Sequence, residues 1–319
     1  MRVINSFDGP VWPGDRSVVT IGAYDGLHRG HRAVIGQVVD RARERGCRSA
    51  VVTFDRHPAS VVRPESAPRL LTTLERRLEL FEQTGIDAVV VLPFDSHAAT
   101  EEAEDFVRRV FVEALGVCAV VVGEDFHFGR ERRGNVALLT EVGRLNDFTV
   151  LPLKLQRSQG DGVISSTAIR KAIGAGDIDT AAMMLGRPVE VIGEVIGGDQ
   201  RGRTIGFPTA NIDVGEGHIV PADGVYAAIC MRADGSEHAC AVNIGRRPTF
   251  HAVADRSLVE AHLLDFDGDL YGERLSVQLV RRIRDERRFD GPDALIAQLS
   301  DDIAETRRAT GVVGEPDRS

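Results

Sequence analysis

Two widely separated segments of the chain carry residue types that could handle phosphate groups. The first reads Gly22-Ala-Tyr-Asp-Gly-Leu-His28-Arg-Gly-His31, and the second reads Gly202-Arg-Thr-Ile-Gly-Phe-Pro-Thr209-Ala-Asn211. The chain has only two lysines, Lys154 and Lys171, and neither lies in these segments, so the phosphate-loop motif Gly-x-x-x-x-Gly-Lys-Ser/Thr is absent. Phosphate chemistry would therefore depend on histidine, arginine, backbone amides and a metal ion.

The first segment has two histidines three residues apart at an expected helix start. Val18 to Ile21 is typical of a buried strand, and Gly22 opens the turn that follows it. His28 and His31 could meet one anion beside the positive end of the helix dipole, an arrangement that suits a pentacoordinate phosphorus. Two alternatives stay open at this point: histidines on an exposed turn without a function, or a metal pair, although no third ligand stands nearby in the sequence.

The second segment combines glycines with hard oxygen donors. Gly202 lets backbone amides approach phosphate oxygens, and Arg203 adds a guanidinium. The hydroxyl of Thr209 and the side-chain carbonyl of Asn211 are oxygen ligands of the kind that suits Mg²⁺. The alternative is a plain proline-threonine turn between two strands.

Composition and charge limit the possible partners. The chain has 319 residues, enough for two domains, and its net charge of -9 argues against nucleic acid as a ligand. Its four cysteines form no Cys-x-x-Cys pair, which predicts free thiols and a cytoplasmic location. No apolar run approaches the roughly 20 residues that span a bilayer, so we expect no membrane association and small molecules as partners.

The pattern of secondary structure changes near residue 186. Before it, β-branched runs alternate with helical patterns, which predicts an α/β fold with a Rossmann-like parallel sheet covered by helices. After it, short strands and one closing helix predict a small antiparallel β-barrel. We therefore predict domains at 1–186 and 187–319. The expected strands are 18–21, 50–54, 88–92, 117–122, 189–196, 224–231, 238–244, 258–264 and 275–282, and the expected helices are 31–45, 74–84, 103–115, 167–173, 178–185 and 292–308.

Three local patterns add detail to these elements. Thr72 followed by Glu75 predicts a capping box at the start of a helix. Asp234-Gly235 between two apolar runs predicts a hairpin. The stretch 265–269 resembles the opening of a calcium loop but lacks the required glycine and glutamate further on, so we interpret it as a hairpin turn.

The segment from Thr20 to His31 resembles the first signature of the histidine-motif nucleotidyltransferases, and specifically that of bacterial bifunctional riboflavin kinase/FAD synthetases. The resemblance continues through Thr53–Pro58, Val122–Gly129 and Ile164–Arg170. In that family the first domain transfers AMP from ATP to FMN and releases pyrophosphate. The resemblance implies that His28 and His31 are catalytic. It implies ATP or phosphate binding by Gly22, His57, Ser165, Ser166, Thr167 and Arg170, and flavin binding by Asp125, Phe126 and Phe128.

The segment from Gly202 to Asn211 resembles the riboflavin kinase signature of the same family, and the match extends from about residue 186 to about residue 308. That family transfers the γ-phosphate of ATP to riboflavin. The resemblance implies that Thr209 and Asn211 bind Mg²⁺ and, with Gly202 and Arg203, ATP. It also implies that Arg288 lies near the flavin.

A base is needed near the riboflavin hydroxyl that is phosphorylated, and the resemblance implies Glu260. Strand alternation puts Val259, Ala261 and Leu263 on one face and Glu260 with His262 on the other. As an isolated residue, Glu260 would more often be a solvated strand carboxylate than a catalytic base.

The chain departs from the family pattern at Ala23, Tyr24, Arg56 and His127, where asparagine, phenylalanine, proline and arginine are usual. Our leading interpretation is an enzyme that converts riboflavin to FMN and then FMN to FAD, with ATP and Mg²⁺. The alternatives are a kinase with an impaired first domain, a flavin-binding regulatory protein without turnover, or a relative of the tRNA synthetases. The sequence leaves the oligomeric state open.

Overall fold

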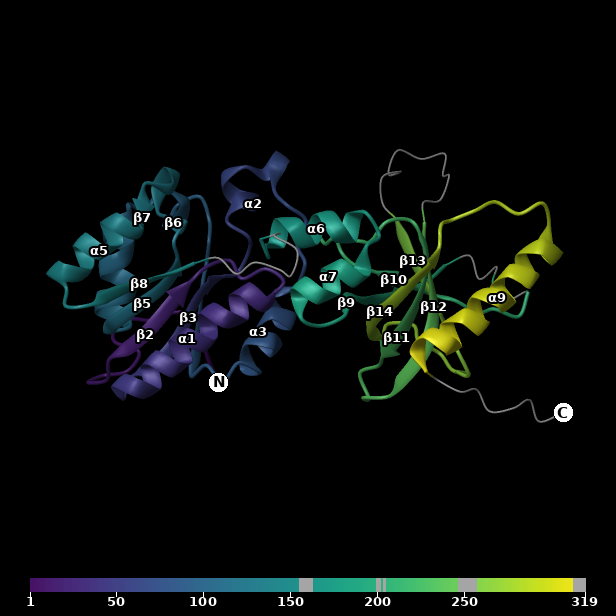
Figure 1. Cartoon of the computed structure of the whole chain (residues 1–319), viewed down its shortest axis with the longest axis horizontal. Helices are drawn as coiled ribbons and strands as arrows, with labels where there is room; N and C mark the ends of the chain where they lie inside the picture. The colour runs from purple at the N-terminus through teal and green to yellow at the C-terminus, as the bar shows by residue number, and fades with distance from the viewer. Residues whose placement is uncertain (155–162, 199–201, 203–204, 246–256, 312–319) are drawn as a thin grey trace. The chain divides into compact units, whose positions relative to one another are not determined.

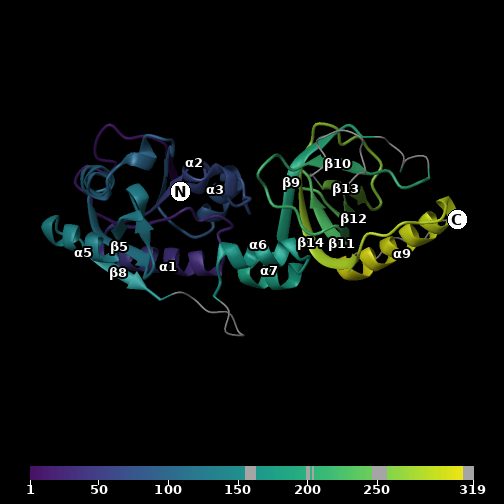
Figure 2. The same ribbon diagram turned by 90° about the horizontal axis from the view of Figure 1, so that it is seen from above.

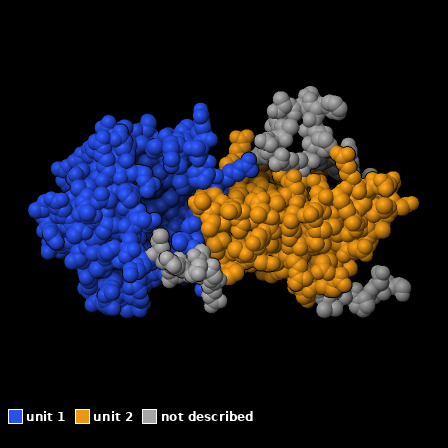
Figure 3. Space-filling view, turned by 45° about the horizontal axis from the view of Figure 1, so that its top comes forward, with its two compact units in different colours: residues 1–166 blue, residues 167–319 orange. Residues whose placement is uncertain are grey.

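The computed structural model describes residues 1–154, 163–198, 202, 205–245 and 257–311. The chain divides into two compact units, Met1–Ser166 and Thr167–Ser319, which Figure 3 colours separately. Each unit has its own sheet or barrel and is described by itself. Among the helices in these ranges, none combines the length and apolar character that crossing a bilayer requires.

Unit 1 contains a six-stranded parallel sheet with the strand order β1-β4-β3-β2-β5-β8. Valine and alanine dominate its central strands, and all five residues of β2 and of β4 are buried. Burial on both faces is what a parallel sheet between helical layers requires. The strands are β1 (Arg2–Ile4), β2 (Ser17–Ile21), β3 (Arg48–Phe54), β4 (Ala88–Leu92), β5 (Val117–Gly123) and β8 (Thr149–Leu153).

Helices cover both faces of this sheet (Figure 1). On one face, Val18 and Val51 pack with Ile35 of α1 (Arg29–Arg45) and Phe81 of α3 (Leu74–Glu82). On the other face, alternate strand residues pack against three further helices. These are α4 (Ala103–Phe106), the π-helix η3 (Val107–Ala114) and α5 (Val136–Leu145). Smaller elements are α2 (Ala59–Val62), η1 (Pro64–Ser66), η2 (Ala98–Thr100), β6 (His127–Phe128), η4 (Arg130–Arg132) and β7 (Gly134–Asn135).

The start of α3 differs by one residue from the prediction. Thr73, and not Thr72, is the N-cap, and its side chain accepts a hydrogen bond from the amide of Arg76. Thr72 is occupied elsewhere, because its hydroxyl donates to the carboxylate of Asp25 at 3.2 Å. The prediction of a capping box at Thr72 is therefore wrong, because the hydroxyl of Thr72 is hydrogen-bonded to Asp25 and Thr73 caps the helix.

Unit 2 is built around a closed antiparallel barrel with the strand order β10-β13-β12-β11-β14-β9. Figure 2 shows the barrel with α9 (Pro292–Thr310) beside β11 and β12. β11 is buried on both faces because α9 packs over its outer side. The barrel strands are β9 (Val189–Ile196), β10 (Ala210–Asp213), β11 (Gly224–Met231), β12 (Glu237–Gly245), β13 (Leu258–Leu263) and β14 (Arg274–Arg284).

The two predicted hairpins have different outcomes. The Asp234-Gly235 turn does connect the paired strands β11 and β12, and Gly235 adopts a φ of 85°. The stretch 265–269 is not a hairpin turn, because β13 pairs with β10 and β12 while β14 pairs with β9 and β11. The connection from β13 to β14 therefore crosses to the other side of the barrel, a path that strand patterns alone could not reveal.

The short helices α6 (Ser166–Gly174) and α7 (Ile178–Leu185) fall almost wholly within unit 2. The amide of Ala222 donates to the carbonyl of Ile173, and α7 packs on β14 and β9. A side chain at Gly176 would lie 2.9 Å from Arg282, so α6 and α7 fit closely against the barrel. The predicted boundary after residue 186 thus lies beyond two helices that pack with the second unit.

A buried ion pair attaches α9 to the barrel. Arg284 on β14 donates to both carboxylate oxygens of Asp302 on α9, from Nε at 2.9 Å to Oδ1 and 3.2 Å to Oδ2 and from Nη2 at 2.7 Å to Oδ2. The side chain of Asp302 is only 2% exposed and that of Arg284 is 17% exposed. Gln298 also donates to the same carboxylate. A neighbouring pair between the same two elements, Arg281 and Glu305, is far more exposed.

We expect Arg284→Met to lower the free energy of unfolding by about 3–5 kcal/mol, because it leaves the carboxylate of Asp302 buried without its cation. Arg281→Met removes a cation from the same strand, and we expect a loss of at most about 1 kcal/mol because that pair is solvated. Urea unfolding of the full chain measures both. Equal losses in the two variants would contradict a specific contribution from the buried pair.

Candidate active sites

In unit 1, the predicted site residues follow the carboxyl ends of three neighbouring strands. Gly22 to His31 follow β2, His57 follows β3, and Asp125 to Phe128 follow β5. Because the strands are parallel, these ends meet at one edge of the sheet. β2 lies between β3 and β5, where the strand order changes direction. Ligands of open α/β sheets bind at such a point.

His28 and His31 form a stacked pair at the start of α1. His28 is the N-cap of the helix, and its Nδ1 accepts a hydrogen bond from the amide of His31 at 3.2 Å. The two rings lie 3.6 Å apart with an angle of 16° between their planes. A Cβ at Gly30 would lie 3.2 Å from the His28 ring, so the small residue at 30 leaves room for this stacking.

These contacts indicate the protonation state of the pair. Since Nδ1 of His28 accepts a hydrogen bond, we infer that a neutral ring carries its proton on Nε2. Burial, followed by the neighbouring His28 and Arg77, lowers the pKa of His31 well below its usual value. Nδ1 of His31 is buried without a hydrogen-bond partner. The free protein therefore presents a neutral His31 beside the first turn of α1, and amides at the start of a helix can bind phosphate oxygens.

The turn that carries the histidines is held from beneath by Arg77. Its side chain is 5% exposed, and its guanidinium donates to the carbonyl of Ala23 at 2.5 Å and to that of Phe54 at 3.0 Å. Arg77 thus joins the turn after β2 to the end of β3. Its position among the apolar residues Leu74, Leu78 and Phe81 of α3 was the sequence signal for a buried arginine.

Asp25 fastens the same turn to the segment before α3. Its side chain is 3% exposed and accepts hydrogen bonds from the amides of Leu71 and Thr72 at 3.0–3.1 Å. Thr72 also accepts a hydrogen bond from the amide of Gly26. Sequence reasoning assigned no role to Asp25 or Arg77, because their partners lie about 20 to 50 residues away along the chain.

Tyr24 shows how the chain accommodates one departure from the family pattern. It adopts a positive φ of 51°, and its hydroxyl lies 2.6 Å from that of Thr20. Burial raises the pKa of this phenol well above its usual range. The ring meets His31 edge-on at 4.9 Å and lies against Gly22, where a Cβ would be only 3.2 Å from it.

The serine-rich segment begins α6. The hydroxyl of Ser166 donates to the backbone carbonyl of Asp25 at 2.9 Å, which connects this segment to the histidine turn. Ser165 directly precedes the helix, while Thr167 and Arg170 lie on it within unit 2.

The predicted flavin residues of unit 1 differ in exposure. Asp125 is exposed, Phe126 is partly buried, and Phe128 is 9% exposed and belongs to the core. The rings of Phe126 and Phe128 stack at 5.3 Å. Phe128 therefore supports Phe126 from the core side. His57 accepts a hydrogen bond from the amide of Ala59 at 3.1 Å.

In unit 2, strand register brings three polar residues into one row. Glu260 on β13 lies opposite Asn211 on β10 and Asn243 on β12. The side-chain amide of Asn243 donates to Glu260 at 3.5 Å. The predicted alternation is confirmed, because Val259, Ala261 and Leu263 are buried whereas Glu260 and His262 are partly exposed. Asn243 was not predicted as a site residue, since only register reveals its position.

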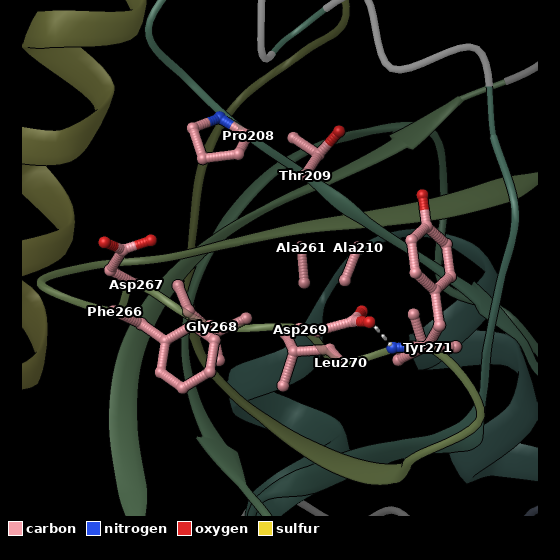
Figure 4. A pocket seen from close by; sticks show the side chains of 12 residues that line it. Pro208, Thr209, Ala210, Ala261, Phe266, Asp267, Gly268, Asp269, Leu270 and Tyr271 are labelled. Atoms are coloured by element: carbon pink, nitrogen blue, oxygen red, sulfur yellow. Dashed lines mark hydrogen bonds between the residues drawn. The ribbon is translucent and has the colours of Figure 1, made fainter.

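A pocket of about 490 Å³ lies on the other side of these strands (Figure 4). Thr209 and Pro208 form its rim, Ala210 and Ala261 form part of its wall, and the 266–271 segment closes it. In Figure 4, Phe266 and Tyr271 stand on opposite sides of these alanines. The β13–β14 connection, which sequence analysis treated as a turn, therefore shapes a cavity beside Thr209.

The donor set near β10 fits a magnesium ion. In the described part of the chain no three His, Cys, Asp or Glu side chains gather into a metal cluster. Thr209 and Asn211 instead offer a hydroxyl and an amide oxygen, the hard donors that Mg²⁺ takes together with substrate phosphates. A Cβ at Gly198 would clash with the side-chain amide of Asn211, so the backbone at Gly198 passes close to this side chain.

Gly202 and Arg203 were predicted to bind ATP, and Arg288 to lie near the flavin. The carbonyl of Gly202 accepts a hydrogen bond from the amide of Phe207 at 2.8 Å, which closes the turn before Thr209. Arg203 lies outside the described residues. Arg288 is exposed in the segment between β14 and α9.

Comparison with known proteins identifies a family for each part of the chain. A family model described as FAD synthetase matches residues 13–168, and a model described as riboflavin kinase matches residues 185–310. A bifunctional riboflavin kinase/FMN adenylyltransferase from Pseudomonas fluorescens is 40% identical over 91% of this chain and 92% of its own length. The chain belongs to the bifunctional riboflavin kinase/FMN adenylyltransferase family.

Other members of this family match equally completely. The protein of that name from Escherichia coli K12 is 36% identical over 94% of this chain and 95% of its own length. A crystal structure described as a macrolide-efflux protein from Streptococcus pneumoniae is 30% identical, has a TM-score of 0.84 and covers 96% of this chain and 99% of its own. The fold class predicted from the sequence, a parallel α/β unit followed by an antiparallel barrel, is thus confirmed for this family member.

We expect Arg77→Met to reduce FAD formation from FMN and ATP by about 10- to 100-fold, because two buried carbonyls lose their donors and the histidine turn shifts. FMN formation from riboflavin should stay within about twofold. Separation of the flavins by chromatography measures both. Arg76→Met, on the same helix but in a surface pair with Glu79, is the matched control and should leave both activities unchanged. Similar losses in the two variants would argue against a role for Arg77.

We expect Asn243→Ala to reduce kcat for riboflavin phosphorylation by about 5- to 20-fold while KM for ATP changes little, because the amide orients Glu260 and does not bind the nucleotide. Steady-state kinetics at saturating riboflavin test this. FAD formation from supplied FMN by the same variant serves as the internal control. A rise in KM with unchanged kcat would show that Asn243 acts in binding instead.

Proposed function

We propose that this chain makes FMN and then FAD, with unit 2 phosphorylating riboflavin and unit 1 adenylylating FMN. The observation that carries the proposal is the stacked His28–His31 pair at the start of α1. In unit 2, strand register places Asn211, Glu260 and Asn243 side by side on three neighbouring strands. The two arrangements suit two different phosphate transfers, and the family models match in the same order.

In unit 1, a phosphate oxygen of FMN attacks the α-phosphorus of ATP, the bond to the β-phosphate breaks and pyrophosphate leaves. Nε2–H of His28, His31 and the first amides of α1 donate hydrogen bonds to oxygens that gain charge in the transition state. Gly22 lets the backbone approach the phosphates. We assign phosphate contacts also to His57, Ser165, Ser166, Thr167 and Arg170.

The flavin of FMN is assigned to the loop after β5. Asp125 is exposed and can accept hydrogen bonds from the ring system, and Phe126 offers a face for stacking. Phe128 lies in the core and fixes the position of Phe126 by the stacked contact at 5.3 Å. In this assignment Phe128 acts on the flavin only through its neighbour.

In unit 2, the terminal ribityl hydroxyl of riboflavin attacks the γ-phosphorus of ATP and ADP leaves. Glu260 accepts the hydroxyl proton, and the amide of Asn243 orients its carboxylate. Thr209 and Asn211 would hold Mg²⁺, which neutralises charge on the phosphates. Gly202 and Arg203 are assigned to the phosphates, and Arg288 to the flavin.

The pocket beside Thr209 is assigned to the adenosine part of ATP. Its wall is apolar at Val195, Ala210 and Ala261, and the rings of Phe266 and Tyr271 flank it. An apolar cavity with a few polar groups at its rim is the usual form of a site for a small organic ligand.

We extend the proposal to domain limits, partners and location. We assign 1–186 to FMN adenylylation and 187–319 to riboflavin phosphorylation, with α6 and α7 as parts of the first sequence domain that belong to the second compact unit. The proposed partners are small molecules and not nucleic acid or membrane, and the proposed location is the cytoplasm. The net charge of -9 and four free cysteines support this assignment.

Two variants separate the proposed activities. With riboflavin, ATP and Mg²⁺, His28→Ala should accumulate FMN and form at least about 100-fold less FAD, because it loses both the helix cap and a phosphate donor. Glu260→Ala should form almost no FMN but still convert supplied FMN to FAD. Chromatography of a time course measures all species.

Equal loss of both steps in either variant would overturn the assignment of one reaction to each unit. Wild-type protein that forms FMN but no FAD would favour a kinase alone, as Ala23 allows. Flavin binding without ATP consumption would favour a regulatory protein.

A further inference from the structure

Two cysteines of unit 1 lie in contact although 71 residues separate them. Sγ of Cys47 is 3.3 Å from Sγ of Cys118. Cys47 follows Gly46, which ends α1, and directly precedes β3, while Cys118 is the second residue of β5. Both side chains are partly exposed, so a small oxidant can reach them.

The pairing of β2 with β5 shifts its register at Cys118. In the pairing of β2 with β5, Ser17 lies opposite Val117 and Val18 lies opposite Ala119, so Cys118 is the extra residue. A bulge redirects the side chain of such a residue. Arg48, next to Cys47, is paired with the same Ser17 from the other side of β2. The two cysteines therefore approach each other across the end of β2.

The local structure allows the sulfurs to move closer together. A disulfide bond is about 2.05 Å long, so the contact must shorten by about 1.3 Å. Cys47 lies in the connection after the left-handed residue Gly46, which has a φ of 61°, and its amide donates to the carbonyl of Ala42 at 2.9 Å. The backbone carbonyl of Cys118 accepts from the side chains of Arg45 and Thr149, each at 3.4 Å. Cys47 precedes β3 and so lies outside the strand ladder, which leaves its side chain to make most of this movement.

The other two cysteines provide a contrast within the same chain. Cys230 and Cys240 lie inside the barrel and are fully buried, and burial raises the pKa of both thiols. No sulfur-sulfur contact joins Cys230 to Cys240, in contrast to the pair in unit 1. Among the described residues, Cys47 and Cys118 alone combine sulfur contact with access to solvent.

We propose that Cys47 and Cys118 form a reversible dithiol-disulfide couple whose oxidised form joins the C-terminal end of α1 to β5. The oxidant is a low-molecular-weight disulfide. One cysteine thiolate attacks it, a first small thiol leaves, and a mixed disulfide forms. The second cysteine then attacks the protein sulfur of the mixed disulfide and releases a second small thiol. The two cysteine protons end on these two thiols, so atoms and electrons balance.

The surroundings predict slow oxidation near neutral pH. Burial and the hydrogen bond with Cys118 raise the pKa of Cys47 to about 11, although the guanidiniums of Arg45 and Arg16 oppose this shift. The reactive species is the thiolate, so its fraction rises about tenfold for each pH unit below that pKa. Oxidation that begins at the Cys47 thiolate should therefore become faster as the pH rises.

The bond would join two elements that lead to the site of unit 1. α1 begins at the His28–His31 pair, and β5 ends just before Asp125. Both cysteines lie at the opposite ends of these elements, so the disulfide should stabilise unit 1 without touching substrate. Cross-linking a loop of this length restricts the unfolded chain strongly.

The test is oxidation of the purified full chain with excess oxidised glutathione at pH 8.5, followed by unfolding and alkylation with N-ethylmaleimide. The reduced protein has four cysteines to alkylate. Mass spectrometry of the oxidised protein should show two alkylated cysteines, a Cys47–Cys118 cross-linked peptide and full reversal by dithiothreitol. The midpoint of thermal unfolding of unit 1 should rise by about 5–10 °C on oxidation.

Matched variants make the outcome decisive. Cys47→Ser and Cys118→Ser should each lose the cross-link and the thermal shift and instead carry one glutathione, while Cys240→Ala should retain both. Stable glutathione adducts on Cys47 and Cys118 of the wild-type chain, or four alkylated cysteines after prolonged oxidation, would overturn the proposal. FAD formation should stay within about twofold between the reduced and oxidised forms.

Discussion

Most backbone and carboxylate groups buried beneath the turn of His28 find their hydrogen-bond partners inside the protein, and this constraint shapes unit 1. In the turn from Gly22 to His28, the carbonyl of Ala23 and the amide of Gly26 both meet side chains inside the protein. The guanidinium of Arg77 meets that carbonyl, and the carboxylate of Asp25 meets amides from the segment before α3. A buried carbonyl without a donor costs about 1–3 kcal/mol, so these contacts determine the shape of the turn.

The same constraint acts on the barrel in another form. On β13, Val259 and Ala261 are buried and Glu260 between them is partly exposed, so its carboxylate lies on the face away from the apolar neighbours. Register then selects the partners, since it places Asn211 and Asn243 on either side of the carboxylate. The inward faces of the same strands help to form the pocket beside Thr209. One face of these two strands, β10 and β13, thus carries Asn211 and Glu260, and the other face lines the pocket that we propose for adenosine.

Two sequence predictions are wrong because a residue or strand pairs with a distant part of the chain and not with its neighbours in sequence. Thr72 has the residue type of a helix cap, but Asp25 uses its hydroxyl and Thr73 caps the helix. The 265–269 stretch has the composition of a tight turn, but β13 and β14 pair with other strands. The short strands β1 and β10 were missed because three or four residues carry too little periodicity to be recognised. Long strands and helices were predicted well because burial repeats along them.

The sequence by itself determined the fold class, the order of the two units and the segments that carry His28, Thr209 and Glu260. These follow from periodicity and from motifs whose residues are close together in the chain. Only the tertiary structure decided that His28 caps α1 and stacks on His31, that Arg77 supports their turn, and that Asn243 adjoins Glu260. The physical reason is that hydrogen bonds and strand register join residues distant in sequence, and no local pattern specifies which distant partner satisfies a buried polar group.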